Sequence, residues 1–187
     1  MKVYTYNNKV LTNSANGKWL KKYVDPCNPL ELPPLTIRIK FSAGYNPAPS
    51  YAYPPITVTA VTGQPDIYDI CLNRTDSWSQ FFRGDTHIIE ILGANTTGVT
   101  NMFESFTSCT ALTSIPLFDT SSLTDVREIF ADCYNVQSGA LALYQQMSTQ
   151  ANPPSTHLEA FYRCGSNTVT GAAELAQIPS SWGGEGA

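Results

Sequence analysis

A repeat of 24 residues in the second half of the chain constrains its fold more than any other feature. Phenylalanine is followed three residues later by cysteine at three places, namely Phe106/Cys109, Phe130/Cys133 and Phe161/Cys164. The first two places lie 24 residues apart, and the residues around them match along the unit. A fixed apolar pattern with a period of about 20–29 residues is typical of leucine-rich solenoids. We therefore expect stacked units that bury one shared core.

Spacing within the unit predicts which side chains form this core. Met102 and Phe106 are four residues apart, so they would share one face of a short helix. Leu112 and Ile115 would then carry the chain into a short strand or turn on the opposite wall. Stacking would place equivalent side chains in a common hydrophobic column. The predicted core consists of Met102, Phe106, Cys109, Leu112, Ile115, Val126, Phe130, Cys133, Phe161 and Cys164.

Both ends of the repeated region depart from the pattern, as the end units of a stack must. Residues 78–91 keep the apolar positions but carry Asp85 in place of cysteine. After Cys133 the pattern opens to admit residues 138–150, where one helical stripe is formed by Ala140, Leu143, Tyr144 and Met147. Residues 138–187 are therefore expected to form a helical C-terminal cap.

The first half of the chain has a different pattern. Residues 36–41, 56–61 and 67–72 are strand-like, and three strands in succession predict a small antiparallel sheet. Before them, a predicted hairpin and short helix lead into a proline-rich segment that favours an extended linker. The expected domains are an N-terminal segment with linker at 1–34, a β module at 35–74 and the repeat region at 75–187.

Together these segments predict an α+β fold class. It comprises a small N-terminal antiparallel β module, followed by a short leucine-rich-repeat-like solenoid with a helical C-terminal cap.

Aromatic side chains outside the repeats are the candidate contact residues. Those near the N-terminus either pack on the next domain or anchor the chain to another protein; they are Tyr4, Tyr6, Trp19 and Tyr23. The proline-rich loop after the first predicted strand carries Tyr45, Tyr51 and Tyr53. Tyrosine is enriched at interfaces because it offers a rigid, amphipathic contact area. This loop either contacts a neighbouring subunit or a sugar, or folds back over its own sheet.

Residue types that serve in active sites are present but do not form a catalytic pattern. His87 and His157 each lie near carboxylates. The cysteines of the repeat share one position in the unit, which indicates small buried hydrophobic side chains rather than nucleophiles. The five cysteines contain no C-x-x-C pair, so neither a zinc site nor a disulfide framework is expected. We expect no enzyme, no cofactor and no metal.

Composition narrows the choice of partner. Eleven Lys+Arg against fifteen Asp+Glu give a formal net charge of -4, whereas nucleic-acid binding usually requires a basic excess. No apolar run approaches the roughly 20 residues that a membrane span needs. Hydrophobic residues make up 42% and charged residues 14% of the chain, which favours a folded protein over a disordered one.

The repeat from Val99-Thr100-Asn101-Met102-Phe103 through Cys109-Thr110-Ala111-Leu112-Thr113-Ser114-Ile115-Pro116 resembles BspA-type leucine-rich repeats. That family occurs on bacterial surface proteins and in proteins of gut bacteria and their phages. The resemblance covers about residues 75–180 and implies a binding or structural role. Residues 1–23, joined to such repeats, also resemble the start of small virion-associated proteins of Bacteroides-infecting, crAss-like gut phages.

These features predict a non-enzymatic phage virion protein that decorates the capsid or tail, or forms a fibre or receptor-contact part. Met1 leads into a polar, alternating segment rather than the apolar core of an export signal, which favours assembly in the host cytoplasm. Expected partners are other virion proteins, further copies of the chain, and a host-surface glycan or protein. The alternative is a bacterial surface adhesin or host-interaction protein, located at the cell surface.

Overall fold

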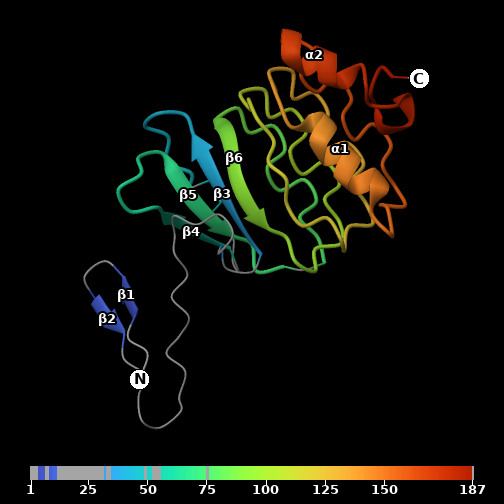
Figure 1. The fold of residues 1–187 in the computed structure, drawn as a ribbon. Coiled ribbons are helices and arrows are strands. Elements are labelled where there is room, and N and C mark those ends of the chain that lie inside the picture. Colours follow the sequence, from blue (N-terminus) through green and yellow to red (C-terminus); the bar gives the residue numbers. More distant parts are fainter. Residues whose placement is uncertain are drawn as a thin grey trace.

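The computed structural model describes residues 4–6, 9–11, 32, 35–48, 50–51, 56–74 and 76–186 (Figure 1). A two-stranded hairpin near the N-terminus consists of β1 (Tyr4–Tyr6) and β2 (Lys9–Leu11). The other strands are β3 (Thr36–Phe41), β4 (Thr57–Ala60), β5 (Ile67–Cys71) and β6 (Ile88–Asn95). The helices are α1 (Ala140–Thr149), α2 (Val169–Leu175) and the 3-10 helix η2 (Ser180–Trp182).

Strands β3 to β6 form one antiparallel sheet in the order β4-β5-β3-β6. The expected antiparallel sheet is thus present, with β6 as an additional strand. Strand β3 lies between β5 and β6, so Ile37 and Ile39 are buried. Buried Arg38 pairs with Asp69 of β5 through two hydrogen bonds of 2.7 and 2.8 Å, which neutralise its charge.

The prediction of a leucine-rich-repeat-like solenoid for residues 75–187 is wrong. The described residues form a small four-stranded antiparallel sheet with two α-helices, and between β6 and α1 the chain forms neither a strand nor a helix. The short helix expected through Met102 and Phe106 is replaced by turns. Glu104 and Ser108 have φ values of 54° and 61°, and left-handed backbone at every fourth residue ends a right-handed helix. The helix expected at 138–150 is present as α1.

Four segments of turns lie against one another, and we call them the turn ladder: residues 77–84, 101–108, 125–132 and 156–163. Alternate residues of each of the first three segments donate backbone N–H groups to carbonyl oxygens of the next, at 2.8–3.1 Å. Trp78 donates to Asn101, for example, and Met102 to Asp125. These hydrogen bonds replace those that a helix or an ordinary sheet would have made.

Phenylalanine rings form a column inside the turn ladder. Phe82, Phe106, Phe130 and Phe161 are stacked, with successive centroid distances of 4.9, 5.2 and 6.2 Å. All ten residues predicted for the repeat core are buried, and Ile115, at 5%, is the most exposed of them. In Figure 1, β6 lies between the rest of the sheet and the turn ladder, and α1 and α2 lie at the far side of the ladder.

No helix in the described part of the chain has the length and apolar character needed to cross a membrane.

Candidate interaction surfaces

The outward side of the turn ladder carries aromatic, leucine and arginine side chains, because the residues between them point into the core. We call this surface the outer face; it consists of Phe103, Arg127, Tyr134, Leu158, Tyr162 and Arg163. Leu158 is 63% exposed and Tyr162 is 42% exposed. The Arg127 guanidinium lies 4.7 Å from the Phe103 ring centroid, and that of Arg163 lies 4.9 Å from the Tyr162 centroid. Such cation–π contacts hold each pair in a defined position.

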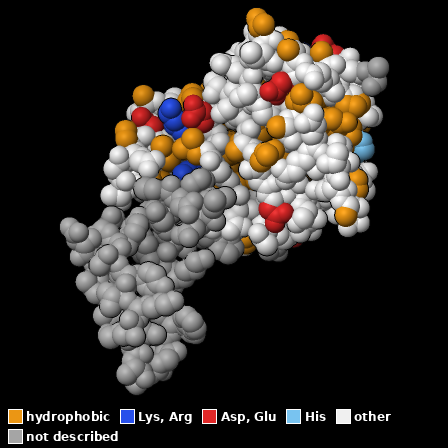
Figure 2. Space-filling model, in the orientation of Figure 1, with side chains coloured by type: hydrophobic (Ala, Val, Ile, Leu, Met, Phe, Trp, Pro, Cys, Tyr) orange, Lys and Arg blue, Asp and Glu red, His pale blue; other side chains and the backbone are white. Residues whose placement is uncertain are grey.

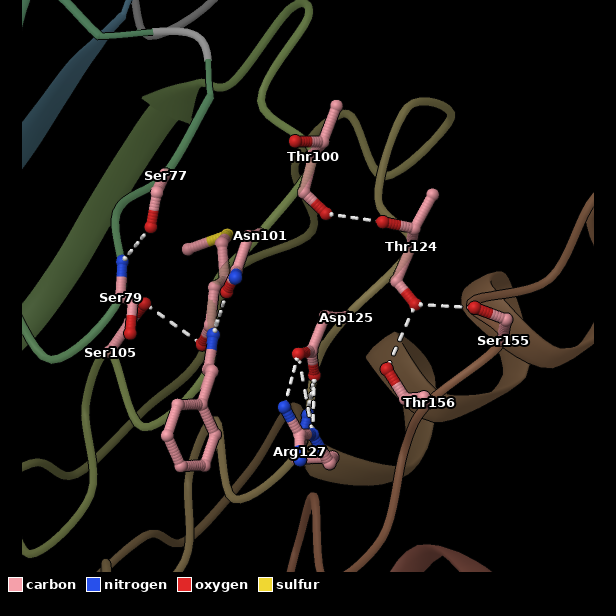
Figure 3. A network of polar contacts seen from close by, with 12 residues as sticks. Ser77, Ser79, Thr100, Asn101, Ser105, Thr124, Asp125, Arg127, Ser155 and Thr156 are labelled. Atoms are coloured by element: carbon pink, nitrogen blue, oxygen red, sulfur yellow. Dashed lines mark hydrogen bonds and ion pairs between the residues drawn. The ribbon is translucent and has the colours of Figure 1, made fainter.

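Carboxylates fix the two arginines of the outer face. Asp125 accepts hydrogen bonds from Arg127 at 3.0 and 2.7 Å, and the pair is drawn in Figure 3. Burial opposes ionisation of Asp125, but the hydrogen bonds from Arg127 outweigh it and lower the pKa of Asp125. Asp132 lies 2.7 Å from the Arg163 guanidinium. Both guanidiniums are therefore held in place while remaining accessible.

A line of glutamates crosses the same side of the turn ladder. Glu104, Glu128 and Glu159 occupy equivalent positions, with φ values of 54°, 53° and 55°. Glu104 accepts hydrogen bonds from Gln80 and Arg83. Burial and the nearby carboxylates of Glu104 and Glu159 raise the pKa of Glu128. The outer face therefore combines apolar side chains with charges of both signs.

Hydroxyl groups tie one edge of the turn ladder together. The Thr100 hydroxyl donates to the Asp76 carbonyl at 2.7 Å, and the Thr124 hydroxyl donates to the Thr100 carbonyl at 3.0 Å. Ser155 and Thr156 continue the series onto the Thr124 carbonyl (Figure 3). These bonds fix the spacing between successive segments of the ladder.

A groove of about 420 Å³ runs along the first segment of the turn ladder, and we call it the edge groove. It is lined by Ser50, Tyr51, Ile56, Leu72, Arg74, Ser77, Trp78, Ser79, Gln80 and Phe81. A second groove, of about 540 Å³, lies beside the end of β6 and includes Leu117, whose side chain is 58% exposed. On the face shown in Figure 2, charged side chains are few, and hydrophobic ones lie scattered over the turn ladder and helices.

The tyrosine loop folds back over the sheet, which was one of its two expected arrangements. Tyr51 is only 7% exposed and packs against the Phe81 and Phe82 rings. Its hydroxyl donates to Asp85, and burial together with this bond raises the pKa of Tyr51. Tyr45 is half-buried and stacks on His87 at 3.9 Å. Tyr51 is therefore not an exposed contact residue; Tyr53 lies outside the described residues.

The predicted anchoring residues lie mostly outside the described part of the chain. Tyr4 and Tyr6 belong to β1, which pairs with β2, and the structure describes only their backbone. Trp19 and Tyr23 lie outside the described residues. The anchoring role of these four residues therefore stays a prediction.

The histidines and repeated cysteines take part in packing and hydrogen bonding. His87 Nδ1 lies 3.4 Å from Asp85, whose carboxylate also accepts the Tyr51 hydroxyl. The Cys109 and Cys133 thiols donate to the Phe82 and Phe106 carbonyls at 3.1 and 3.0 Å. Burial raises the pKa values of Cys109, Cys133 and Cys164. These thiols therefore stay protonated at neutral pH, which disfavours nucleophilic attack and metal binding.

Within the described residues, no group of three or more histidines, cysteines and acidic residues is arranged to hold a metal ion.

Sequence reasoning missed the outer face. Phe103, Arg127 and Leu158 occupy one position of the turn ladder, directly before a glutamate, and Phe103 and Arg127 each follow a buried residue. Their residue types differ, so a search for repeated side chains passes over them. The available signal was the position itself, because a residue between the buried positions of a stacked segment must point outward.

No family model, curated protein or solved structure matches this chain.

Proposed function

We propose that the chain is a non-enzymatic structural protein of a bacteriophage virion, and that its outer face binds a partner protein. The observation that carries the binding proposal is the exposure of Leu158 and Tyr162 beside two guanidiniums that lie against aromatic rings. Aromatic residues and arginine are enriched where proteins meet, and they dominate binding energies. The virion setting is supported by the resemblance of residues 1–23 and of the repeated sequence to gut-phage proteins.

Rigidity of the turn ladder favours binding by this face. The hydrogen bonds between segments fix the backbone that carries Phe103, Arg127 and Leu158. Asp125 and Asp132 hold the guanidiniums before any partner arrives. A surface that is already ordered loses little conformational entropy on association, so more of the contact energy appears as affinity.

The state of the thiols supports a non-enzymatic role. Cys109 and Cys133 donate to buried carbonyls instead of facing a groove, and burial raises their pKa values. The enzymatic activity to test is polysaccharide cleavage, with gut polysaccharides as substrates. Release of reducing ends by the purified chain would contradict this part of the proposal.

Mass spectrometry of purified virions tests the proposal that the chain is a virion protein. We expect the chain in a fixed stoichiometric ratio to the other particle proteins. Its absence from particles, together with its presence on the bacterial surface, would instead favour the adhesin alternative.

A matched pair of leucine variants tests the outer face. Leu158→Asp places a charge in the proposed interface, whereas Leu117→Asp places the same charge on a leucine of similar exposure beside β6. We expect L158D to abolish incorporation into particles and L117D to be incorporated normally. Equal incorporation of both folded variants would contradict the use of this face.

A further inference from the structure

Strand β4 forms one edge of the four-stranded sheet, and within the described residues no strand lies beyond it. The opposite edge, formed by β6, is covered by a later segment of the chain, because Glu90 bridges to Ser114. Figure 1 shows β4 on the side of the sheet away from the turn ladder. The sheet therefore has one covered edge and one open edge.

The hydrogen bonds between β4 and β5 show which backbone groups of β4 point outward. Directly after the strand, the Val61 N–H donates to the Ile67 carbonyl of β5 at 2.9 Å. Along an antiparallel strand, residues that bond to the neighbouring strand alternate with residues that face away from it. The backbone groups of Thr59 therefore face β5, and those of Val58 and Ala60 face away. No described residue makes a hydrogen bond to these outward groups.

Strand β4 has none of the features by which edge strands usually avoid further pairing. Natural edges carry lysine, proline or a bulge, any of which opposes the approach of another strand. The sequence of β4 contains no charged residue and no proline, and its register with β5 has no bulge. Its threonine and valine residues favour extended backbone. The open edge is therefore regular, uncharged and suited to accept one more strand.

We propose that two copies of the chain pair antiparallel through β4, with a two-fold axis at Thr59. This register pairs Val58 of each copy with Ala60 of the other. Residues in such a pair exchange both N–H···O hydrogen bonds, so every outward group of the two strands is satisfied. A shift of one residue would set outward groups of one copy against inward groups of the other. The two-fold axis makes the surface self-complementary, as in most dimers.

The side chains of β4 favour a second copy over a charged partner segment. With the axis at Thr59, threonine lies opposite threonine, which is a favourable cross-strand pair, whereas like charges in this place would repel. Val58, which packs against the core, lies opposite Ala60. The cross-strand neighbour of Thr59 on β5 is Asp69, and Arg38 neutralises its charge. Identical strands therefore meet at this edge without charge repulsion.

Sedimentation velocity of the full chain tests the proposal. The pairing is short and buries little area, so we expect a weak dimer with a dissociation constant of about 10 µM to 1 mM. Ala60→Pro removes an N–H that faces away from β5, so the hydrogen bonds between β4 and β5 remain. We expect A60P to weaken the dimer at least about tenfold. Leu158→Asp, on the outer face, should dimerise like the wild type, because the proposal does not depend on that face.

A pair of opposite charges at the axis gives a second test that does not require proline. Thr59 is exposed and lies opposite its own copy, so Thr59→Lys or Thr59→Glu sets two like charges against each other. We expect each variant alone to dimerise at least about tenfold more weakly than the wild type, and an equimolar mixture of the two to recover the loss. Thr86→Lys and Thr86→Glu change an exposed residue outside β4, and their mixture should behave like each variant alone. Thermal unfolding confirms that each variant is folded.

Three results would overturn the proposal: a chain that stays monomeric up to about 1 mM, an unchanged dimer in folded A60P, or no recovery in the mixture of T59K and T59E. If the chain is monomeric but A60P abolishes its binding to another particle protein, the open edge accepts that protein and not a second copy. If L158D abolishes the dimer, the outer face is the self-contact. Each of these results leaves the test of the outer face by incorporation into particles unaffected.

Discussion

Left-handed backbone at single residues determines the shape of the turn ladder. Outside glycine this conformation costs about 1–2 kcal/mol per residue. Ser108 adopts it with a φ of 61°, whereas the equivalent residue of the first segment is Gly84, with a φ of 73°. Glycine relieves this strain. Its greater conformational entropy in the unfolded chain offsets part of the gain, by about 0.5–1 kcal/mol. We expect Ser108→Gly to stabilise the protein by up to about 1 kcal/mol, measured by thermal unfolding.

The control for this prediction is Thr110→Gly. Thr110 has no left-handed backbone, so glycine relieves no strain there and the substitution should lower the melting temperature. A fall of similar size in both variants would show that strain at Ser108 is negligible.

Buried thiols give a prediction on reactivity. Burial raises the pKa values of Cys109, Cys133 and Cys164, so all three stay in the unreactive thiol form at pH 8. We expect iodoacetamide to modify them only after unfolding in guanidinium, measured by mass spectrometry of the labelled peptides. Half-exposed Cys71 serves as an internal comparison that reacts in the folded chain. Rapid labelling of Cys133 in the folded protein would contradict the burial of these thiols.

The raised pKa of Glu128 predicts that the stability of the protein depends on pH. Burial, Glu104 and Glu159 raise its pKa above the ordinary value of 4.5, so the unfolded state loses this proton more readily than the folded state does. This group therefore contributes full stability below about pH 4.5 and loses it as pH rises through the folded pKa. Glu128→Gln should raise the melting temperature at pH 7 and have no such effect at pH 4. Exposed Glu185→Gln is the control, and an equal gain in both variants at pH 7 would contradict the prediction.

At the scale of elements, helix α1 depends on helix α2 for its N-terminus. Gly139, which precedes α1, provides no side-chain cap. Instead, the backbone N–H groups of Gly139 and Leu141 lie 3.3 and 3.1 Å from the Glu174 carboxylate of α2. A carboxylate at this place both accepts these N–H groups and favours the helix dipole. We expect Glu174→Ala to destabilise the protein by about 1 kcal/mol and to speed hydrogen exchange at Leu141.

Glu174→Gln is the matched variant, because it keeps an acceptor but removes the charge. It should lie between the wild type and E174A in both measurements. Unchanged exchange at Leu141 in E174A would show that α1 does not need this cap.

Elements with local sequence signals could be predicted, and those set by distant contacts could not. Alternation predicted β3, β4 and β5, and the apolar stripe predicted α1. The four-residue spacing of Met102 and Phe106 is compatible with a helix, but it also fits turns with left-handed backbone at Glu104 and Ser108. Hydrogen bonds to residues 23 or more positions away decide between them, and local propensity does not report those bonds.

The candidate surfaces were harder to predict than the core for a related reason. Identical or similar side chains recur where the core requires them, so Phe106, Phe130 and Phe161 are visible in the sequence. Exposed positions are free to vary, and Phe103 and Arg127 become one surface only when the segments stack.

At the scale of the whole molecule, the sheet and the turn ladder share one core. Strand β6 pairs with β3 on one side, and its residue Glu90 bridges to Ser114 on the other. The buried cluster is continuous from Ile39 in β3, through the phenylalanine column, to Trp182 near the C-terminus. Elements joined by a continuous core are expected to unfold together.

Trp182→Ala tests this cooperativity from the end farthest along the chain. Trp182 is 6% exposed and contacts the rings of His157 and Tyr144, so its removal should cost about 3–5 kcal/mol. If the molecule is one cooperative unit, the loss will appear equally in the exchange protection of Ile39 in β3 and Phe130 in the ladder, because both amides exchange through global unfolding. If Ile39 keeps its protection while Phe130 loses it, the sheet is a separate folding unit and the shared core does not couple the two parts.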